Sequence, residues 1–179
     1  MGISKLTKSQ VFYSDFVVGT LIIVSAIIIY YNYIGYITAQ SSGSLNDIIA
    51  DINTISSNLI TSGSPENWTT TNIQRIGLTN NEQRILYSKL VEFKNIPYNQ
   101  SKNILSTKFD YVVYFERWND TIISIDNQCA IGDPRVVAND TTVCLRPNLT
   151  LVNPRRTVKD IRLGIYENEI LQMIIYLWE

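Results

Sequence analysis

Apolar and polar residues follow different patterns along this chain, and the most marked pattern lies near its start. From residue 16 to residue 37 no charged side chain occurs, and the central run LIIVSAIII is almost purely hydrocarbon. A helix rises 1.5 Å per residue, so this stretch is long enough to cross the roughly 30 Å hydrocarbon core of a bilayer. Apolar residues cover every side of that helix, which disfavours a helix buried in a protein core. The pattern therefore predicts a transmembrane helix over about 16–37.

The flanks of this span predict its orientation. Lys5 and Lys8 precede it, and no further lysine or arginine occurs until Arg75. Because basic residues stay on the cytoplasmic side, we expect the N-terminus in the cytoplasm and the chain after residue 37 outside the cell. The alternative is a removable secretory signal, but its apolar core is usually about 7–15 residues long, and ITAQ is a poor cleavage site. Tyrosines at one end of the span fit an interfacial aromatic belt: Tyr30, Tyr31, Tyr33 and Tyr36.

A second apolar pattern follows the span. The residues SSGS at 41–44 predict a flexible hinge. Apolar residues then recur at helical spacing, at Leu45, Ile48, Ile49, Ile52, Ile55 and Leu59. We therefore expect one long helix over 10–60, bent near Gly43, with its first half in lipid and its second half on an outer domain.

The remaining residues, 61–179, alternate between short apolar runs and turn-forming residues. The runs TVKDIRLGIY and ILQMIIYLW, separated by ENE, predict a hairpin whose last strand is apolar enough to be central. Thr79 and Glu82 stand in capping-box register, which predicts a helix over 79–95. The other expected elements are strands at 73–78, 109–117 and 122–126, short strands around 135–138 and 149–153, and a short helix over 99–105. The predicted fold class is α+β, with a long N-terminal hydrophobic helix followed by a small antiparallel β-sheet domain with short helices.

Cysteines and glycosylation triplets also point to an extracellular outer domain. The chain has two cysteines, Cys129 and Cys144, both after the span, and such a pair predicts a disulfide. Two free buried thiols are the alternative. N-x-[ST] triplets mark possible N-glycosylation sites, although an Asn- and Thr-rich chain forms some by chance. All five lie after the span, at Asn67, Asn99, Asn119, Asn139 and Asn148.

Composition narrows the classes of function. The net charge is −1 and only 17% of residues are charged, so no basic stripe exists to bind nucleic acid. The chain has no histidine, which removes the usual catalytic dyads, triads and proton shuttles. Carboxylates occur at expected strand edges and turns, where solvated acids are common: Asp110, Glu116, Asp120 and Asp126. We expect no enzyme, cofactor, structural metal or small-molecule substrate, with weak calcium binding by Asp126, Asn127 and Asp133 as a minor alternative.

Several stretches together resemble one family. A basic leader, residues 1–9, ends at Lys8-Ser9 and is followed by QVFYSD and the apolar helix. The segments SGSPENW and IQRIGL resemble a Gly-x-Pro-x-x-Trp turn and the following strand in related archaeal membrane proteins. NIPYNQSKNILSTKFDYVVYF resembles their short helix and aromatic strand, and IRLGIYENEILQMIIYLW resembles their C-terminal hairpin. The chain is thus similar to archaeal type IV pilin-like proteins with class III signal peptides.

This resemblance implies a function. In that family a prepilin peptidase cuts the leader at the cytoplasmic face, which here implies processing at Lys8, Ser9 and Gln10, between the last two. The family commonly has an acid at the fifth position after the cut, and here Asp15 is the sixth. An acid near this point can pair with the new N-terminal ammonium during assembly. The implied protein is a membrane-anchored subunit that joins like subunits in a helical surface filament. The alternative is a single-pass, membrane-anchored extracellular protein that serves as a binding or envelope protein and never polymerises.

Overall fold

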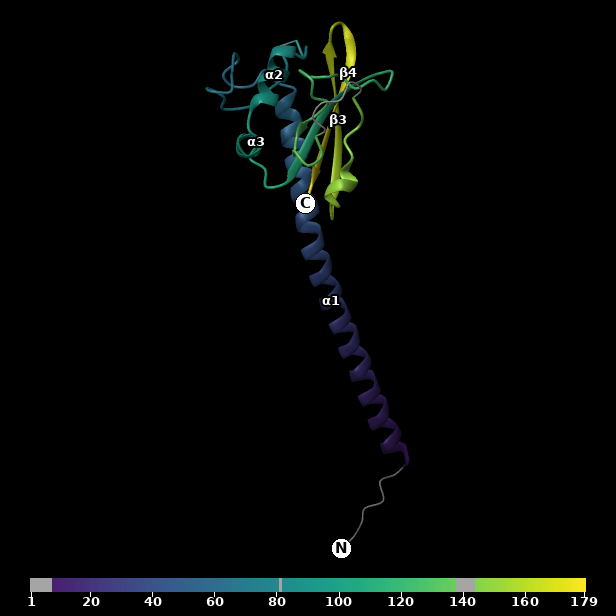
Figure 1. Ribbon diagram of the computed structural model, residues 1–179. Helices are drawn as coiled ribbons and strands as arrows, with labels where there is room; N and C mark the ends of the chain where they lie inside the picture. The colour runs from purple at the N-terminus through teal and green to yellow at the C-terminus, as the bar shows by residue number, and fades with distance from the viewer. Residues whose placement is uncertain (1–7, 81, 138–143) are drawn as a thin grey trace. The chain divides into compact units, whose positions relative to one another are not determined.

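The computed structural model describes residues 8–80, 82–137 and 144–179, and for α1 the side chains of 15–33 and 45–59 (Figure 1). Helix α1 comprises Lys8–Leu59. The chain divides into two compact units, Met1–Ser44 and Leu45–Glu179. The described residues of the first unit are all helical. The second unit combines the end of α1 with a sheet and two short α-helices. The α+β fold class predicted from the sequence is therefore confirmed.

The second unit is built on a four-stranded antiparallel sheet with the strand order β2-β1-β4-β3. Its elements are α2 (Tyr87–Asn95), α3 (Tyr98–Ile104), β1 (Asp110–Arg117), β2 (Ile131–Gly132), a 3-10 helix (Leu149–Val152), β3 (Thr157–Tyr166) and β4 (Glu169–Trp178). Strand β4 lies between β1 and β3, so the prediction that the last strand is central is correct. Strand β1 is buried along nearly its whole length, as its apolar sequence predicted.

The C-terminal hairpin has the predicted two strands and a tight turn. Its ladder runs from Tyr166 opposite Glu169 to Thr157 opposite Trp178. The two turn residues between the strands, Glu167 and Asn168, have φ angles of 50° and 64°. Positive φ at both positions is what a type I′ turn requires, and this turn matches the natural twist of a hairpin.

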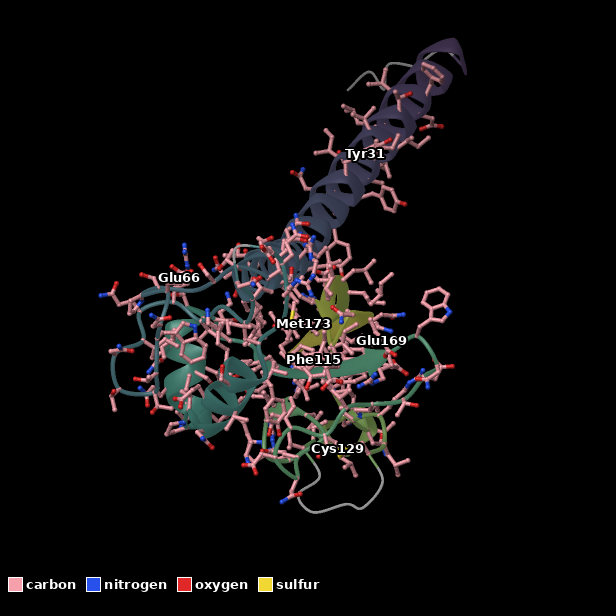
Figure 2. All side chains as sticks on the ribbon, turned by 90° about the horizontal axis from the view of Figure 1, so that it is seen from above. Tyr31, Glu66, Phe115, Cys129, Glu169 and Met173 are labelled. Atoms are coloured by element: carbon pink, nitrogen blue, oxygen red, sulfur yellow. A yellow bond between two sulfur atoms is a disulfide. The ribbon has the colours of Figure 1, made fainter. Side chains whose placement is uncertain are left out.

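One face of the sheet packs on helices. The end of α1 contributes four buried residues of the predicted stripe, Ile48, Ile52, Ile55 and Leu59, whereas Leu45 and Ile49 are partly exposed. Helices α2 and α3 lie beside this part of α1, on the same side of the sheet (Figure 1). Figure 2 shows Phe115 and Met173 on this face of the sheet, where both are buried.

The opposite face of the sheet is covered by the long connection between β1 and β3. Its core contains Val112, Tyr114, Ile174 and Trp178 from the strands, and Ile122, Cys129, Ala130, Val136 and Val137 from the connection. Figure 2 shows Cys129 on the side of the sheet away from Met173. The alternation of side chains along β1 and β4 therefore divides the domain into two apolar cores.

Residues 41–44, expected as a hinge within one long helix, are helical and lie where the first compact unit ends. Two predictions between residues 73 and 95 are wrong in detail. Residues 73–78 contain one isolated bridge, from Arg75 to Ser64, and do not form a strand. Helix α2 begins at Tyr87 instead of 79, because the preceding residues pair among themselves: Leu86 N–H donates to Leu78 O at 2.9 Å, and Thr79 bridges Ile85.

The connection between β1 and β3 also differs from the prediction. Residues 122–126 meet β1 through one bridge, Ile122 to Glu116, and one hydrogen bond, Ile123 N–H to Phe115 O, and do not form a full strand. Residues 135–137 lie in a turn, since Val136 and Val137 N–H groups both bond to Asp133 O. The expected strand at 149–153 is a 3-10 helix, capped by the Asn148 side chain. The short strand β2 was not predicted, because two residues carry no periodicity.

Candidate functional sites

The segment Asp15–Tyr33 is a candidate membrane span. Its 19 residues have a mean hydropathy of 1.9, and none is buried inside the described structure. Large apolar side chains, among them Phe16, Ile22 and Ile29, are exposed all around the helix. Such a surface is stable in lipid or against other apolar helices, and not in water. One helix of the described chain is thus long and apolar enough to cross a bilayer.

Three polar side chains within this segment donate hydrogen bonds to carbonyls of the helix itself. Thr20 Oγ1 donates to Phe16 O at 2.8 Å, and Ser25 Oγ donates to Leu21 O at 2.8 Å. Asn32 Nδ2 donates in the same way to the carbonyl four residues earlier, at 2.9 Å. A hydrocarbon environment requires such internal partners, because it offers no water to bond the polar groups.

The residues of the expected processing site lie at the start of this helix. Lys8, Ser9 and Gln10 are helical, and their side chains fall outside the described residues. Asp15 lies in α1 with its side chain exposed, at the N-terminal edge of the apolar segment. Cleavage between Ser9 and Gln10 and pairing by Asp15 stay predictions.

The predicted disulfide between Cys129 and Cys144 is confirmed, with an S–S distance of 2.09 Å and a Cα–Cα distance of 5.2 Å. Cys129 is buried in the core of the second sheet face. An ion pair supports the returning chain, because Arg146 Nη2 lies 2.6 Å from the buried Glu116 Oε1 and 3.0 Å from Asp120 Oδ1. The disulfide and this ion pair together hold the connection on the sheet.

Four of the five possible glycosylation sites lie on the described surface. Asn67, Asn99, Asn119 and Asn148 are exposed, whereas Asn139 lies outside the described residues. At Asn148 the triplet is folded on itself, since Thr150 N and Thr150 Oγ1 donate to Asn148 Oδ1 at 3.0 and 2.7 Å. All four are accessible to a modifying enzyme, and their glycosylation stays a prediction.

The acids considered for calcium are paired with basic side chains. Asp126 forms an ion pair with Lys94, and the buried Asp133 accepts hydrogen bonds from Arg135. Within the described residues no group of three or more acids, cysteines or histidines is placed to hold a metal ion. Both carboxylates are therefore already paired with cationic side chains.

A polar cluster joins α3 to the start of β1. Asp110 Oδ1 accepts hydrogen bonds from Tyr98 Oη and Lys102 Nζ, each at 2.8 Å, and its Oδ2 lies 2.8 Å from Arg135 Nη2. Burial raises the pKa of Asp110, but these hydrogen bonds and the two cations outweigh burial and leave the pKa below its ordinary value. The pKa of Tyr98 is raised, by burial and by the neighbouring carboxylate. The arrangement stabilises the ionised form of Asp110.

Sequence reasoning missed a capping site at the C-terminal end of α1. The last carbonyls of a helix have no partner within it. Here Leu78 N donates to Leu59 O at 2.8 Å, and the Thr79 hydroxyl donates to Ile60 O at 2.7 Å. Lys89 Nζ donates to Ser62 O at 2.5 Å and places a positive charge near the negative end of the helix dipole.

Lys89 is a buried cation held by backbone groups. Its Nζ also donates to Thr79 O at 3.0 Å, and the residue is almost fully covered. Burial lowers the pKa of Lys89, and the charge of Glu66 opposes this shift. No local pattern could have revealed the site, because the partners lie far from Lys89 in the sequence. Thr79, which was expected to cap the helix that follows, caps the helix that precedes it.

Two glycines permit the close packing around this cap. Gly63 has a φ of 80°, a value that residues with a side chain rarely adopt. A methyl group at Gly77 would overlap the backbone nitrogen of Gly63. Trp68, which is buried beside them, donates from Nε1 to Gly77 O at 2.8 Å. The SGSPENW and IQRIGL segments are therefore one structural unit that closes the end of α1.

Comparisons with known protein families, with characterised proteins and with solved structures gave no match for this chain. The inference about function therefore rests on the geometry described above and on the sequence motifs.

Proposed function

We propose that this chain is a non-enzymatic, membrane-anchored surface protein, and specifically a pilin-like subunit of an archaeal surface filament. The subunit is held in the cell membrane by one span before assembly, with its N-terminus in the cytoplasm and the sheet domain outside. Its partners are the membrane, a prepilin peptidase and like subunits. The filament would serve adhesion or attachment to surfaces.

The observation that carries this proposal is that the two ends of α1 have different surroundings. Its Asp15–Tyr33 segment exposes apolar side chains on every side, whereas Ile48, Ile52 and Ile55 of the same helix are buried in the sheet domain. One element thus provides both an anchor and part of a folded core. If the anchor leaves lipid, its exposed surface needs a comparable apolar environment, which a bundle of the same helices in a filament core supplies.

The outer domain supports an extracytoplasmic location. Its only cysteines form a disulfide, and disulfides persist mainly in oxidising compartments. Four glycosylation triplets are exposed on the same unit. The alternative, a permanently anchored binding or envelope protein, shares these properties but lacks assembly, so assembly is the property to test.

The sharpest test concerns Asp15. After cleavage before Gln10, Asp15 lies five residues along the helix, a rise of about 7.5 Å, and not on the same side as the new N-terminus. The carboxylate is therefore better placed to pair with the ammonium of a neighbouring subunit than with its own. Asp15→Asn should be inserted, processed and folded normally, while filament yield falls, since breaking a buried pair can cost about 3–5 kcal/mol.

The measurement is the ratio of filament to processed membrane-bound subunit for wild type and variant. Asp47→Asn is the matched control, because Asp47 is an exposed acid of the same helix whose partner, Lys108, lies within its own domain. Equal ratios for all three proteins would refute the pairing. A native protein that begins at Met1, or unchanged filaments in cells lacking the chain, would favour the permanently anchored alternative.

A further inference from the structure

Strand β3 forms one edge of the sheet, and most of that edge is open. Only its end is covered, where Ile85 N–H donates to Ile165 O at 2.8 Å and Ile165 N–H donates to Gln83 O at 3.3 Å. These bonds show that Ile165 directs its backbone groups away from β4. Because the direction alternates along a strand, Lys159, Ile161 and Leu163 do the same. Within the described residues, no hydrogen bond from another element reaches the backbone of these three.

The side chains beside this open edge are apolar and exposed. Ile161 is 45% exposed and Leu163 is 62% exposed, on the sheet face that the disulfide-closed connection otherwise covers. Ile165 and Ile170 continue the exposed row towards the turn. An open edge flanked by apolar side chains is a template for another strand.

We propose that this edge binds a second copy of the same chain, β3 to β3 and antiparallel, with Ile161 opposite Ile161 at the two-fold axis. In an antiparallel pair, residues that direct their backbone groups outward must oppose one another. Outward groups belong to alternate residues, so a symmetric pair is centred on a residue and not between two residues.

The charges along β3 determine on which residue the symmetric pair is centred. A pair centred on Lys159 opposes two lysines, one centred on Asp160 opposes two aspartates, and one centred on Arg162 opposes two arginines. Like charges directly opposite one another are destabilising. Centring on Ile161 instead places Asp160 opposite Arg162 of the second copy, twice, and leaves Lys159 beside Leu163. A pair centred on Leu163 would oppose Ile161 with Ile165, whose outward backbone groups already bond to Ile85 and Gln83. Of these centres, only Ile161 makes the edge complementary to itself.

The direction of β3 determines which copies can meet. At the start of β3, Thr157 lies opposite Trp178 of β4, and Trp178 in turn lies opposite Asp110 at the start of β1. Further along β3, Arg162 Nε donates to Ser56 Oγ, near the end of α1, at 3.1 Å. Near the start of β1, Lys108 Nζ lies 3.1 Å from Asp47 Oδ2. Strand β3 therefore runs in the same direction as residues 45–59. In an antiparallel pair residues 45–59 of the two copies therefore run in opposite directions, an arrangement open to copies anchored on two facing surfaces.

Cross-linking of the full chain in detergent tests the register. In Ile161→Cys the two Cα atoms would lie about 5.5 Å apart, within the range of a disulfide. In Leu163→Cys, the matched control, they would lie about 13 Å apart. Under mild oxidation we expect a covalent dimer for the first variant and its loss for the second. Equal cross-linking of both, or none at position 161, would overturn the proposal.

Tethering of lipid vesicles that carry the full chain tests the charge pairing. Asp160→Arg opposes only arginines and Arg162→Asp opposes only aspartates, so vesicles of either variant alone should lose clustering by light scattering. Mixing the two populations should restore clustering, because each supplies the charge that the other lacks. Circular dichroism should show that both variants are folded.

A proline variant separates edge pairing from other contacts. Ile161→Pro removes an N–H that points away from β4, so the hairpin should stay folded, as edge strands tolerate proline at such positions. Clustering should be lost. Folded variants that cluster like the wild type, or a mixture that fails to cluster, would refute self-pairing. Neither assay depends on filament formation, so their results are independent of the proposed function.

Discussion

Reduction of the Cys129–Cys144 bond should destabilise the sheet domain by a predictable amount. The bond closes a segment with a sequence separation of 15 residues. In the chain-entropy model a loop of this length contributes about 3 kcal/mol by restricting the unfolded chain. For a domain of this size, each kcal/mol shifts the melting temperature by about 3–4 °C, so reduction should lower the melting temperature by about 10 °C.

Near-ultraviolet circular dichroism of the full chain in detergent measures this effect selectively. Trp68 and Trp178 are 3% and 2% exposed and lie in the two different cores of the domain, while the apolar segment contains no tryptophan. The tryptophan signal therefore reports loss of packing in the outer domain and not melting of α1. Melting curves are compared with and without a reductant, after mass spectrometry has verified reduction.

The double variant Cys129→Ala/Cys144→Ala is the matched control. Its melting temperature should equal that of the reduced wild type and should not respond to the reductant. A chelator should leave both proteins unchanged, because cationic side chains already pair with Asp126 and Asp133. If complete reduction leaves the melting temperature of the wild type unaltered, the bond does not stabilise the domain and the reasoning from loop entropy is refuted.

Three further substitutions or conditions test the cap of α1 and the polar cluster. Lys89→Met should cost about 1–3 kcal/mol in urea unfolding, because the carbonyls of Ser62 and Thr79 lose their donor; an unchanged midpoint would contradict the capping role. Gly77→Ala should cost about 1–3 kcal/mol through overlap with backbone atoms, and a neutral result would show that the backbone can move apart. Folding lowers the pKa of Asp110 below its ordinary value of 3.8. The ionised carboxylate therefore stabilises the fold above pH 3.8, and this stabilisation is lost as the pH falls through the lower pKa of the folded state. When the free energy of unfolding is measured against pH in acid, Asp110→Asn should lose less stability than the wild type.

The elements that were predicted correctly are those defined by local pattern. The β3–β4 hairpin combines two apolar runs with a two-residue turn, and α3 follows directly after a proline. Helix α2 shows the limit of such reasoning. Thr79 and Glu82 have the spacing of a capping box, but Leu78 and Thr79 instead donate hydrogen bonds to the end of α1. Contacts between distant segments prevailed over a valid local signal.

The same distinction applies to the sites. The disulfide could be predicted because a chain with two cysteines permits a single pairing. The role of Lys89 could not, since its partners are backbone carbonyls 27 and 10 residues away and backbone carbonyls leave no mark in a sequence. The open edge of β3 was equally hidden, because the pattern of its side chains does not say which strand will lie beside it.

The apolar surface of the Asp15–Tyr33 helix and that of the β3 edge require different surroundings, and the reason lies in the backbone. In the Asp15–Tyr33 helix the main-chain groups are bonded within the helix, and Thr20 and Ser25 add their hydroxyls to it, so the segment can enter hydrocarbon. The edge of β3 has free N–H and C=O groups at Ile161, and each would cost several kcal/mol in lipid. Lipid or a helical bundle therefore suits the first surface, while the second must face water or another strand. The proposed assembly through α1 and the proposed pairing through β3 are thus separable, and a variant that removes one should leave the other intact.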